Sequence, residues 1–157
     1  QIDASGKPNS LEASWRSKHI GVVYQSYYLI PELTVMENVL MSVRLSKLSM
    51  NDYKERALEL SVQMGVSDKR RQIPSKLSGG ERQRAAIIRS IVNQSKILFA
   101  DEPSGNLDEK NSTKLIDLST RINRDYNMTI MLTTHNPSIA GIGDTVYELK
   151  SGVLIKK

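Results

Sequence analysis

The sequence has 157 residues, 39% of them hydrophobic and 25% charged, which is enough for one globular domain with a substantial core. It contains no cysteine, which excludes disulfides and thiolate metal sites and fits a cytosolic protein. No apolar run approaches the roughly 20 residues needed to span a bilayer, and the polar start has no signal-peptide pattern. The net charge is +5, but the densest basic cluster is only residues 69–71 and acidic residues occur throughout. We therefore interpret the charge as solvated surface and expect no nucleic-acid partner.

Three short apolar runs predict strands, at residues 20–24, 97–100 and 129–133. They are rich in apolar or β-branched residues and do not alternate with polar ones, as expected for strands covered on both faces. The second and third runs are separated by a helical pattern whose apolar residues share one face, namely Leu115, Ile116, Leu118 and Ile122. This order predicts a β-α-β unit and a parallel sheet.

The segment between the first two strands has a different character. Residues 37–47 and 52–64 have helical periodicity, and Asn51 or Asp52 is a suitable N-cap for the second helix. One side of that helix is apolar, with Ala57, Leu58, Leu60 and Met64. A proline ends the pattern, so residues from about 34 to 75 are expected to form a helical insert. At the other end of the chain, residues from about 144 to 157 predict a hairpin with a glycine in its turn.

The most informative string is Leu-Ser-Gly-Gly-Glu-Arg-Gln at residues 77–83. A helical pattern begins directly after Ser78, so backbone N–H groups and the positive end of the helix dipole suit an anion such as phosphate. Side chains at Gly79 and Gly80 would block a close approach. For an isolated Ser-Gly-Gly, a helix cap with a flexible turn would be the simpler interpretation.

Polar residues follow each predicted strand. Asp101 and Glu102 end the second strand, Gln25 ends the first and His135 follows the third. Ligands of open α/β sheets lie outside the carboxyl ends of the strands, and a Mg²⁺-nucleotide gives two adjacent acids a role there. Taken singly, the two acids could be an exposed pair at a loop start, Gln25 a polar strand end and His135 a structural histidine.

In this order, these residues resemble five motifs of the ABC ATPases. Gln25 matches the Q-loop, residues 77–83 the signature motif, Asp101 and Glu102 the Walker B motif with its catalytic glutamate, Asp108 the D-loop and His135 the switch histidine. The resemblance covers essentially all of residues 1–157. It implies an α/β fold, the P-loop NTPase (RecA-like) core with a parallel sheet and a helical insert. The sequences of residues 33–39 and 101–108 are similar to those found in the branch of lipoprotein-releasing, macrolide-export and cell-division ATPases.

The resemblance also implies roles for these residues, with ATP and Mg²⁺ as cofactors. Glu102 would polarise the attacking water, Asp101 and Gln25 would hold Mg²⁺, and Gln25 and His135 would contact the γ-phosphate. The signature residues Ser78, Gly79, Gly80 and Gln83 would bind the nucleotide of a second subunit. Asp108 would connect the two sites across the dimer interface.

The implied function is ATP hydrolysis that drives export or mechanotransmission. The implied partners are a second ABC ATPase domain, identical or different, and a transmembrane permease. The implied location is the cytoplasmic face of the plasma (inner) membrane. Two alternatives are a non-transport ABC ATPase, and an inactive regulatory subunit that donates only its signature motif. The short insert disfavours the first, and the presence of Glu102 and His135 disfavours the second.

The sequence has no G-x-x-x-x-G-K-[ST] pattern, the P-loop that cradles phosphates. The pair Gly6-Lys7 fails because Pro8 offers neither a hydroxyl for Mg²⁺ nor an N–H for phosphate. By the resemblance, the P-loop and its strands are expected to precede Gln1. Residues 1–157 alone are therefore expected to lack ATPase activity.

Overall fold

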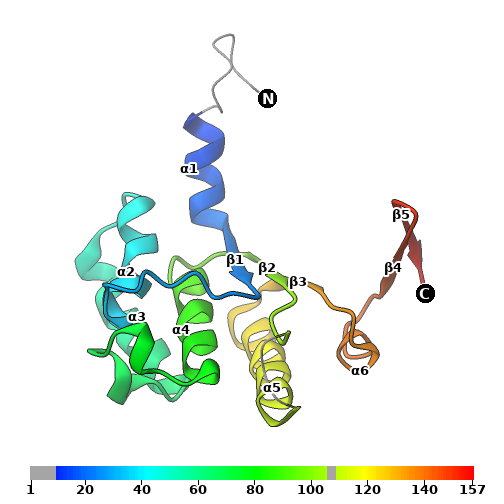
Figure 1. Cartoon of the computed structure of the whole chain (residues 1–157). Coiled ribbons are helices and arrows are strands. Elements are labelled where there is room, and N and C mark those ends of the chain that lie inside the picture. Colours follow the sequence, from blue (N-terminus) through cyan, green and yellow to red (C-terminus); the bar gives the residue numbers. More distant parts are fainter. Residues whose placement is uncertain (1–9, 106–108) are drawn as a thin grey trace.

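A computed structural model describes residues 10–105 and 109–157 (Figure 1). Its elements, in chain order, are α1 (Ser10–His19), β1 (Ile20–Tyr24), α2 (Val35–Leu45), α3 (Met50–Gln63), the 3₁₀ turns η1 (Ser67–Lys69) and η2 (Pro74–Lys76), α4 (Gly79–Ile91), β2 (Ile97–Asp101), α5 (Glu109–Tyr126), β3 (Thr129–Thr133), α6 (Pro137–Ala140), β4 (Tyr147–Lys150) and β5 (Val153–Lys156). None of the helices in these residues is long and apolar enough to cross a membrane.

The sheet confirms the predicted parallel arrangement. The three strands lie in the order β1-β2-β3, and both pairs are parallel. The register aligns Tyr24 with Asp101 and Asp101 with Thr133, so all three strands end at the same edge. Helix α5 connects β2 to β3, as the apolar face with buried Leu115 and Ile122 predicted.

The prediction that the strands are covered on both faces is wrong for the described residues. In β1 and β2 the burial alternates, because successive side chains point to opposite faces of a sheet. Val23 and Leu98 point into a core shared with Ile88 of α4, whereas Met131 of β3 is 58% exposed. The core therefore lies mainly on one side of the sheet.

Helix α2 begins two residues earlier than the periodicity predicted, because of a capping box. The Thr34 hydroxyl accepts a hydrogen bond from the Glu37 N–H at 3.3 Å, and the Glu37 carboxylate accepts one from the Thr34 N–H at 2.8 Å. These two bonds satisfy N–H groups that have no partner within the helix.

Helix α3 differs from the prediction at its start and on one face. Its N-cap is Ser49, not Asn51 or Asp52, because a left-handed residue (Lys47, φ 54°) ends α2 and turns the chain early enough for α3 to begin at Met50. Leu58 is 36% exposed and does not join the apolar face that packs into the core, whose buried members are Ala57, Leu60 and Met64.

The prediction did not include helix α1, which leads into β1 (Figure 1). It has few apolar residues, so it shows no helical periodicity in the sequence. Trp15 stacks on His19 one turn later, with ring centroids 4.6 Å apart. Its end is anchored by Asn93, which donates hydrogen bonds to the Ser17 carbonyl at 3.2 Å and to the Ser46 hydroxyl at 2.9 Å.

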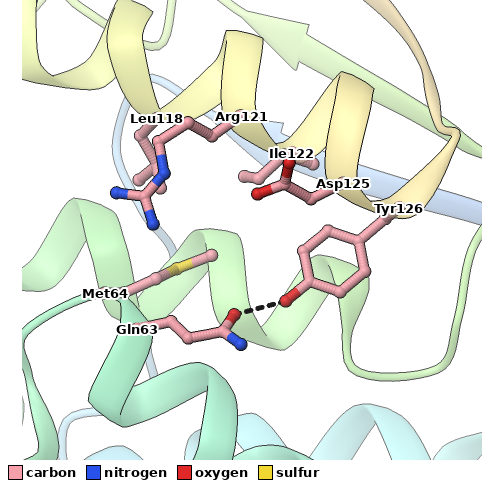
Figure 2. Close-up of a pocket in the computed structure, with 7 residues that line it drawn as sticks. All are labelled: Gln63, Met64, Leu118, Arg121, Ile122, Asp125 and Tyr126. Atoms are coloured by element: carbon pink, nitrogen blue, oxygen red, sulfur yellow. Dashed lines mark hydrogen bonds between the residues drawn. The ribbon is translucent and has the colours of Figure 1, made fainter.

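Helices α3 and α5 contact each other around a small pocket (Figure 2). The Tyr126 hydroxyl hydrogen-bonds to the Gln63 side chain, and the Arg56 guanidinium lies 5.1 Å from the Tyr126 ring centroid. The pocket has a volume of about 10 Å³, which is room for at most a single water molecule. We therefore treat it as a packing feature between the two helices.

The chain ends in the expected hairpin, although β4 begins at Tyr147 and not at about residue 144. Ser151 and Gly152 both have positive φ, 48° and 81°, which is the type I′ geometry that suits the twist of a two-residue hairpin. The hairpin stands apart from the helices in Figure 1, and apolar side chains such as Leu149 (68% exposed) are uncovered in the described residues.

Candidate active site at the strand ends

The carboxyl ends of β1, β2 and β3 bring the predicted site residues to one edge of the sheet. Asp101 is the last residue of β2, and Gln25, Glu102 and His135 follow β1, β2 and β3 within two positions. Because the three strands are parallel and in register, residues that are distant in the sequence gather at one place. This edge is where open α/β sheets bind ligands.

Thr133 holds the Asp101 carboxylate and the backbone of Glu102 in place. Its hydroxyl donates a 2.7 Å hydrogen bond to Asp101 Oδ1, and its carbonyl oxygen accepts the Glu102 N–H at 3.1 Å. Sequence reasoning did not select Thr133. The available signal was a hydroxyl residue at the last position of an apolar strand.

Glu102 and His135 form a hydrogen-bonded pair. Glu102 Oε1 lies 2.9 Å from His135 Nδ1, and because an ionised carboxylate only accepts, Nδ1 is the donor. The His135 side chain is 81% exposed, and its other nitrogen, Nε2, is on the opposite side of the ring from Nδ1. Glu102 itself has a left-handed φ of 44°, a conformation that costs about 1–3 kcal/mol and is concentrated at functional sites.

The second oxygen of Glu102 is a buried acceptor that has no partner among the described residues. Oε2 is shielded from solvent and makes no hydrogen bond with the described residues. A buried carboxylate oxygen without a hydrogen bond costs free energy, so this position favours the binding of a water molecule or of a ligand group that donates a hydrogen bond to Oε2.

Gln25 lies against the loop that follows β2. A Cβ atom built on Gly105 would be only 2.5 Å from Gln25 Nε2, and the Gly105 N–H donates to the Glu102 carbonyl at 2.9 Å. The lack of a side chain at Gly105 therefore lets the Gln25 amide approach the Glu102 loop.

Ser78 is the N-cap of α4 and forms a second capping box. Its hydroxyl accepts from the Glu81 N–H at 3.3 Å and donates to Glu81 Oε2 at 2.8 Å. Hydrogen bonds from the backbone N–H and hydroxyl of Ser78 lower the pKa of Glu81 below its ordinary value of 4.5. Ser78 is exposed, so this end of α4 presents the predicted anion-binding group at the surface.

Gln83 does not belong to that exposed end of α4, in contrast to its assignment to the nucleotide-binding signature set. Its side chain is 1% exposed, because helical periodicity turns it into the core. Both amide atoms lack hydrogen-bond partners in the described part of the chain. We therefore leave Gln83 out of the proposed nucleotide contacts.

The structure does not join all the predicted groups into one site. No hydrogen bond among the described residues links Ser78 to Glu102 or to His135. Asp108, the predicted D-loop residue, lies outside the described residues. In the turn after Gln25, Tyr28 is 65% exposed, while Leu29 packs against Val35, Leu77 and Ala85.

Comparison with known proteins places this arrangement in a family. A relative described as the lipoprotein-releasing system ATP-binding protein LolD, from Cytophaga hutchinsonii, is 38% identical over 91% of this chain and 65% of its own length. A protein with the same description from Wigglesworthia glossinidia brevipalpis is 40% identical over 100% of this chain and 71% of its own.

A solved structure also resembles the fold. The ATP-binding cassette MJ0796, described as a dimer in a post-hydrolysis state bound to ADP and Pi, matches with a TM-score of 0.82 and 30% identity over 97% of this chain and 68% of its own. The chain spans less than two thirds of the length of the first curated relatives that it matches, 65% and 61%. The family model described as ABC transporter matches residues 1–105, and the chain therefore belongs to the ABC transporter ATP-binding family.

Proposed function

We propose that this chain forms the catalytic part of an ATP-hydrolysing subunit of an ABC transporter of the lipoprotein-release branch. The observation that carries the proposal is the meeting of Asp101, Glu102 and His135 at the carboxyl edge of the sheet, with Glu102 hydrogen-bonded to His135 at 2.9 Å. An acid positioned by a histidine at this edge suits the activation of a water molecule for attack on a phosphoryl group.

In this proposal Glu102 is the general base. Its Oε1 is held by His135, and its Oε2, which has no partner in the described part of the chain, is the oxygen that accepts a hydrogen bond from the attacking water. His135 holds the carboxylate through Nδ1 and presents Nε2 toward the γ-phosphate. The left-handed backbone at Glu102 contributes to the direction in which its carboxylate points.

The residues at this edge fit Mg²⁺ bound together with a nucleotide. Asp101 and Gln25 supply the carboxylate and amide oxygens that Mg²⁺ prefers, and Mg²⁺ commonly binds through one or two carboxylates with phosphate oxygens completing its shell. The described residues contain no cluster of three or more potential ligands that would hold a metal alone. The ion would neutralise charge on the phosphates, while Thr133 keeps the Asp101 carboxylate oriented.

The signature end of α4 is proposed to act on the nucleotide of a second subunit. Ser78 is exposed and makes no hydrogen bond to the described strand-end residues of its own chain, which leaves it able to face a partner's nucleotide. Gly79 is partly exposed and Gly80 is buried, so the first N–H groups of the helix would reach phosphate oxygens from the side of Ser78 and Gly79. Asp108 is proposed to lie at the interface between the two subunits.

A transmembrane permease is the proposed second partner. The exposed Tyr28, in the turn that carries Gln25, is a candidate contact for it. The relatives named for lipoprotein release support a location at the cytoplasmic face of the inner membrane.

The test is Mg²⁺-ATP hydrolysis by the full-length natural protein, measured for the parent, Glu102→Gln and Glu59→Gln. Glu59 is an exposed residue of α3, so its substitution is a matched control for loss of one carboxylate. Loss of the general base is expected to lower kcat by about 10²–10⁴-fold. Equal turnover in Glu102→Gln and the control would remove Glu102 from the proposed role, and no turnover in the parent with its membrane partner would refute the proposed activity.

A further inference from the structure

We propose that Arg89 is a positioning residue that fixes the turn carrying Gln25 onto helix α4. This inference rests on the proposed ATPase function, in which Gln25 contacts Mg²⁺ and the γ-phosphate. Arg89 lies in the last turn of α4, well away from Ser78, and the proposed mechanism does not use it.

The turn after Gln25 has an unfavourable backbone conformation. Tyr27 and Tyr28 have φ values of 60° and 45°, both in the left-handed region, although neither is a glycine. A left-handed conformation costs an L-residue about 1–2 kcal/mol, so two in succession need support from outside the turn. The backbone of the turn makes hydrogen bonds from the Tyr27 N–H to the Tyr24 carbonyl at 3.2 Å and from the Tyr28 N–H to the Ser26 carbonyl at 2.6 Å.

Arg89 supplies that support through both ends of its guanidinium. Nη2 donates to the Tyr27 carbonyl at 2.7 Å, and Nη1 donates to the Tyr28 carbonyl at 2.5 Å. The planar fork of an arginine can hold two adjacent carbonyl oxygens at once, which the single ammonium of a lysine cannot do in the same geometry. Burial lowers the pKa of the Arg89 guanidinium, and of its two bonds the one to Tyr27 is partly buried while the one to Tyr28 is exposed.

A second arginine of α4 contacts the same turn. Arg82 lies two helical turns before Arg89, and its guanidinium carbon is 5.8 Å from the centroid of the Tyr27 ring. Residues seven apart share one face of a helix, so Arg82 and Arg89 together hold the ring and the carbonyls of one turn. The conformation of this turn determines where Gln25 points, because only Ser26 separates Gln25 from Tyr27.

The chemical consequence concerns the rate of hydrolysis more than ATP binding. Gln25 meets Gly105 of the Glu102 loop at close range, so a loosened turn would displace the amide from the reacting phosphate. Misplacement of about 1 Å in such a group can cost about 10²-fold in rate. The groups proposed to bind the rest of the nucleotide are not part of the turn.

The experiment compares Arg89→Lys with Arg44→Lys in the full-length natural protein. Arg44 is an exposed residue in the last turn of α2 whose side chain makes no hydrogen bond with the described residues, so it controls for an arginine-to-lysine change near the end of a helix. We expect Arg89→Lys to lower kcat about 10–100-fold with KM for ATP within about twofold of the parent. Amide hydrogen exchange of residues 26–30 is expected to rise in Arg89→Lys, while the amides of α4 keep their protection.

Each outcome decides the proposal. Unchanged exchange in the turn of Arg89→Lys would show that the arginine does not hold it. Faster exchange with unchanged kcat would show that the held turn does not position Gln25. A parent without turnover would refute the proposed function and with it the catalytic role of the turn. The exchange result would still decide whether the Arg89 clamp, meaning its two hydrogen bonds to the Tyr27 and Tyr28 carbonyls, holds the turn. If Arg89→Lys does not fold, Arg82→Gln provides the same comparison, with smaller changes of the same kind expected.

Discussion

The two capping boxes allow the structural and catalytic roles of Ser78 to be separated. Ser78 caps α4 and Thr34 caps α2 with nearly identical geometry. In each, the hydroxyl accepts the N3 N–H at 3.3 Å and donates to the glutamate at 2.7–2.8 Å. Only Ser78 lies in the signature motif. We therefore expect Ser78→Ala and Thr34→Ala to have equal effects on stability and different effects on activity.

The size of the stability effect follows from the geometry. The 3.3 Å contact is longer than an ideal hydrogen bond, and both caps are at the surface, so the loss falls in the lower half of the usual range, about 1 kcal/mol. For a protein of this size that lowers the Tm by roughly 2–4 °C. In Ser78→Ala the loss of a hydroxyl that contacts a phosphate in the transition state is expected to lower kcat by about 10–100-fold as well.

The assay is thermal unfolding and Mg²⁺-ATP hydrolysis on the same preparations of the full-length natural protein. The expected result is two similar shifts in Tm and a loss of kcat in Ser78→Ala alone. If Thr34→Ala loses as much activity, the effect of Ser78 acts through helix stability. If Ser78→Ala loses stability and keeps its turnover, the signature hydroxyl has no catalytic contact.

The remaining predictions concern two glycines, one carboxylate and nucleotide binding. Gly105→Ala would place a Cβ 2.5 Å from the flexible end of Gln25, so kcat should fall about tenfold with little change in Tm, and an unchanged kcat would contradict the close approach. Gly21→Ala would place its Cβ 2.2 Å from the Ser90 carbonyl, so chemical denaturation should show a loss of about 1–3 kcal/mol or more; a neutral effect would contradict the packing of β1 on α4. The pKa of Glu81 is lowered in the folded state, so ionised Glu81 stabilises the fold. This stabilisation is complete at pH values above the ordinary pKa of 4.5 and is lost as the pH falls through the lowered pKa. The stability difference between the parent and Glu81→Gln should therefore shrink between about pH 6 and about pH 3, and a constant difference would exclude this linkage. Calorimetry should detect weak or no ATP binding by the 157-residue chain, since its sequence has no P-loop, and tight binding would contradict that expectation.

Several features could be predicted from the sequence because their signals are local. A strand is visible as a short apolar run, and the polar residue that ends it is visible as well. Parallel strands end at one edge, and the resemblance to the ABC ATPases was what assigned Gln25 and His135 to the same site as Asp101. The family resemblance, which the comparisons confirm, rests on the same short motifs.

The predictions of helix boundaries and of side-chain exposure were less accurate. Periodicity shows which residues share one face of a helix, but not which other elements pack against that face. The start of α3 was placed at Asn51 or Asp52 although Ser49 is the cap, and Leu58 was assigned to a buried face although it is 36% exposed. Coverage of the sheet was overestimated for the same reason, as the 58% exposure of Met131 shows. The bounds of the helical insert, residues 34–75, remain a prediction of domain organisation.

The sequence by itself determined the family, the order of the strands along the chain and which polar residues end them, because each of these is written in a few consecutive residues. Only the tertiary structure decided which partners those residues have. The Glu102–His135 pair joins positions 33 apart, and the Arg89 clamp joins α4 to a turn 61 and 62 positions away. The burial of Gln83 likewise depends on what packs against α4. Contacts between residues this distant are set by how helices and strands pack in space, and no local pattern of residue types records them.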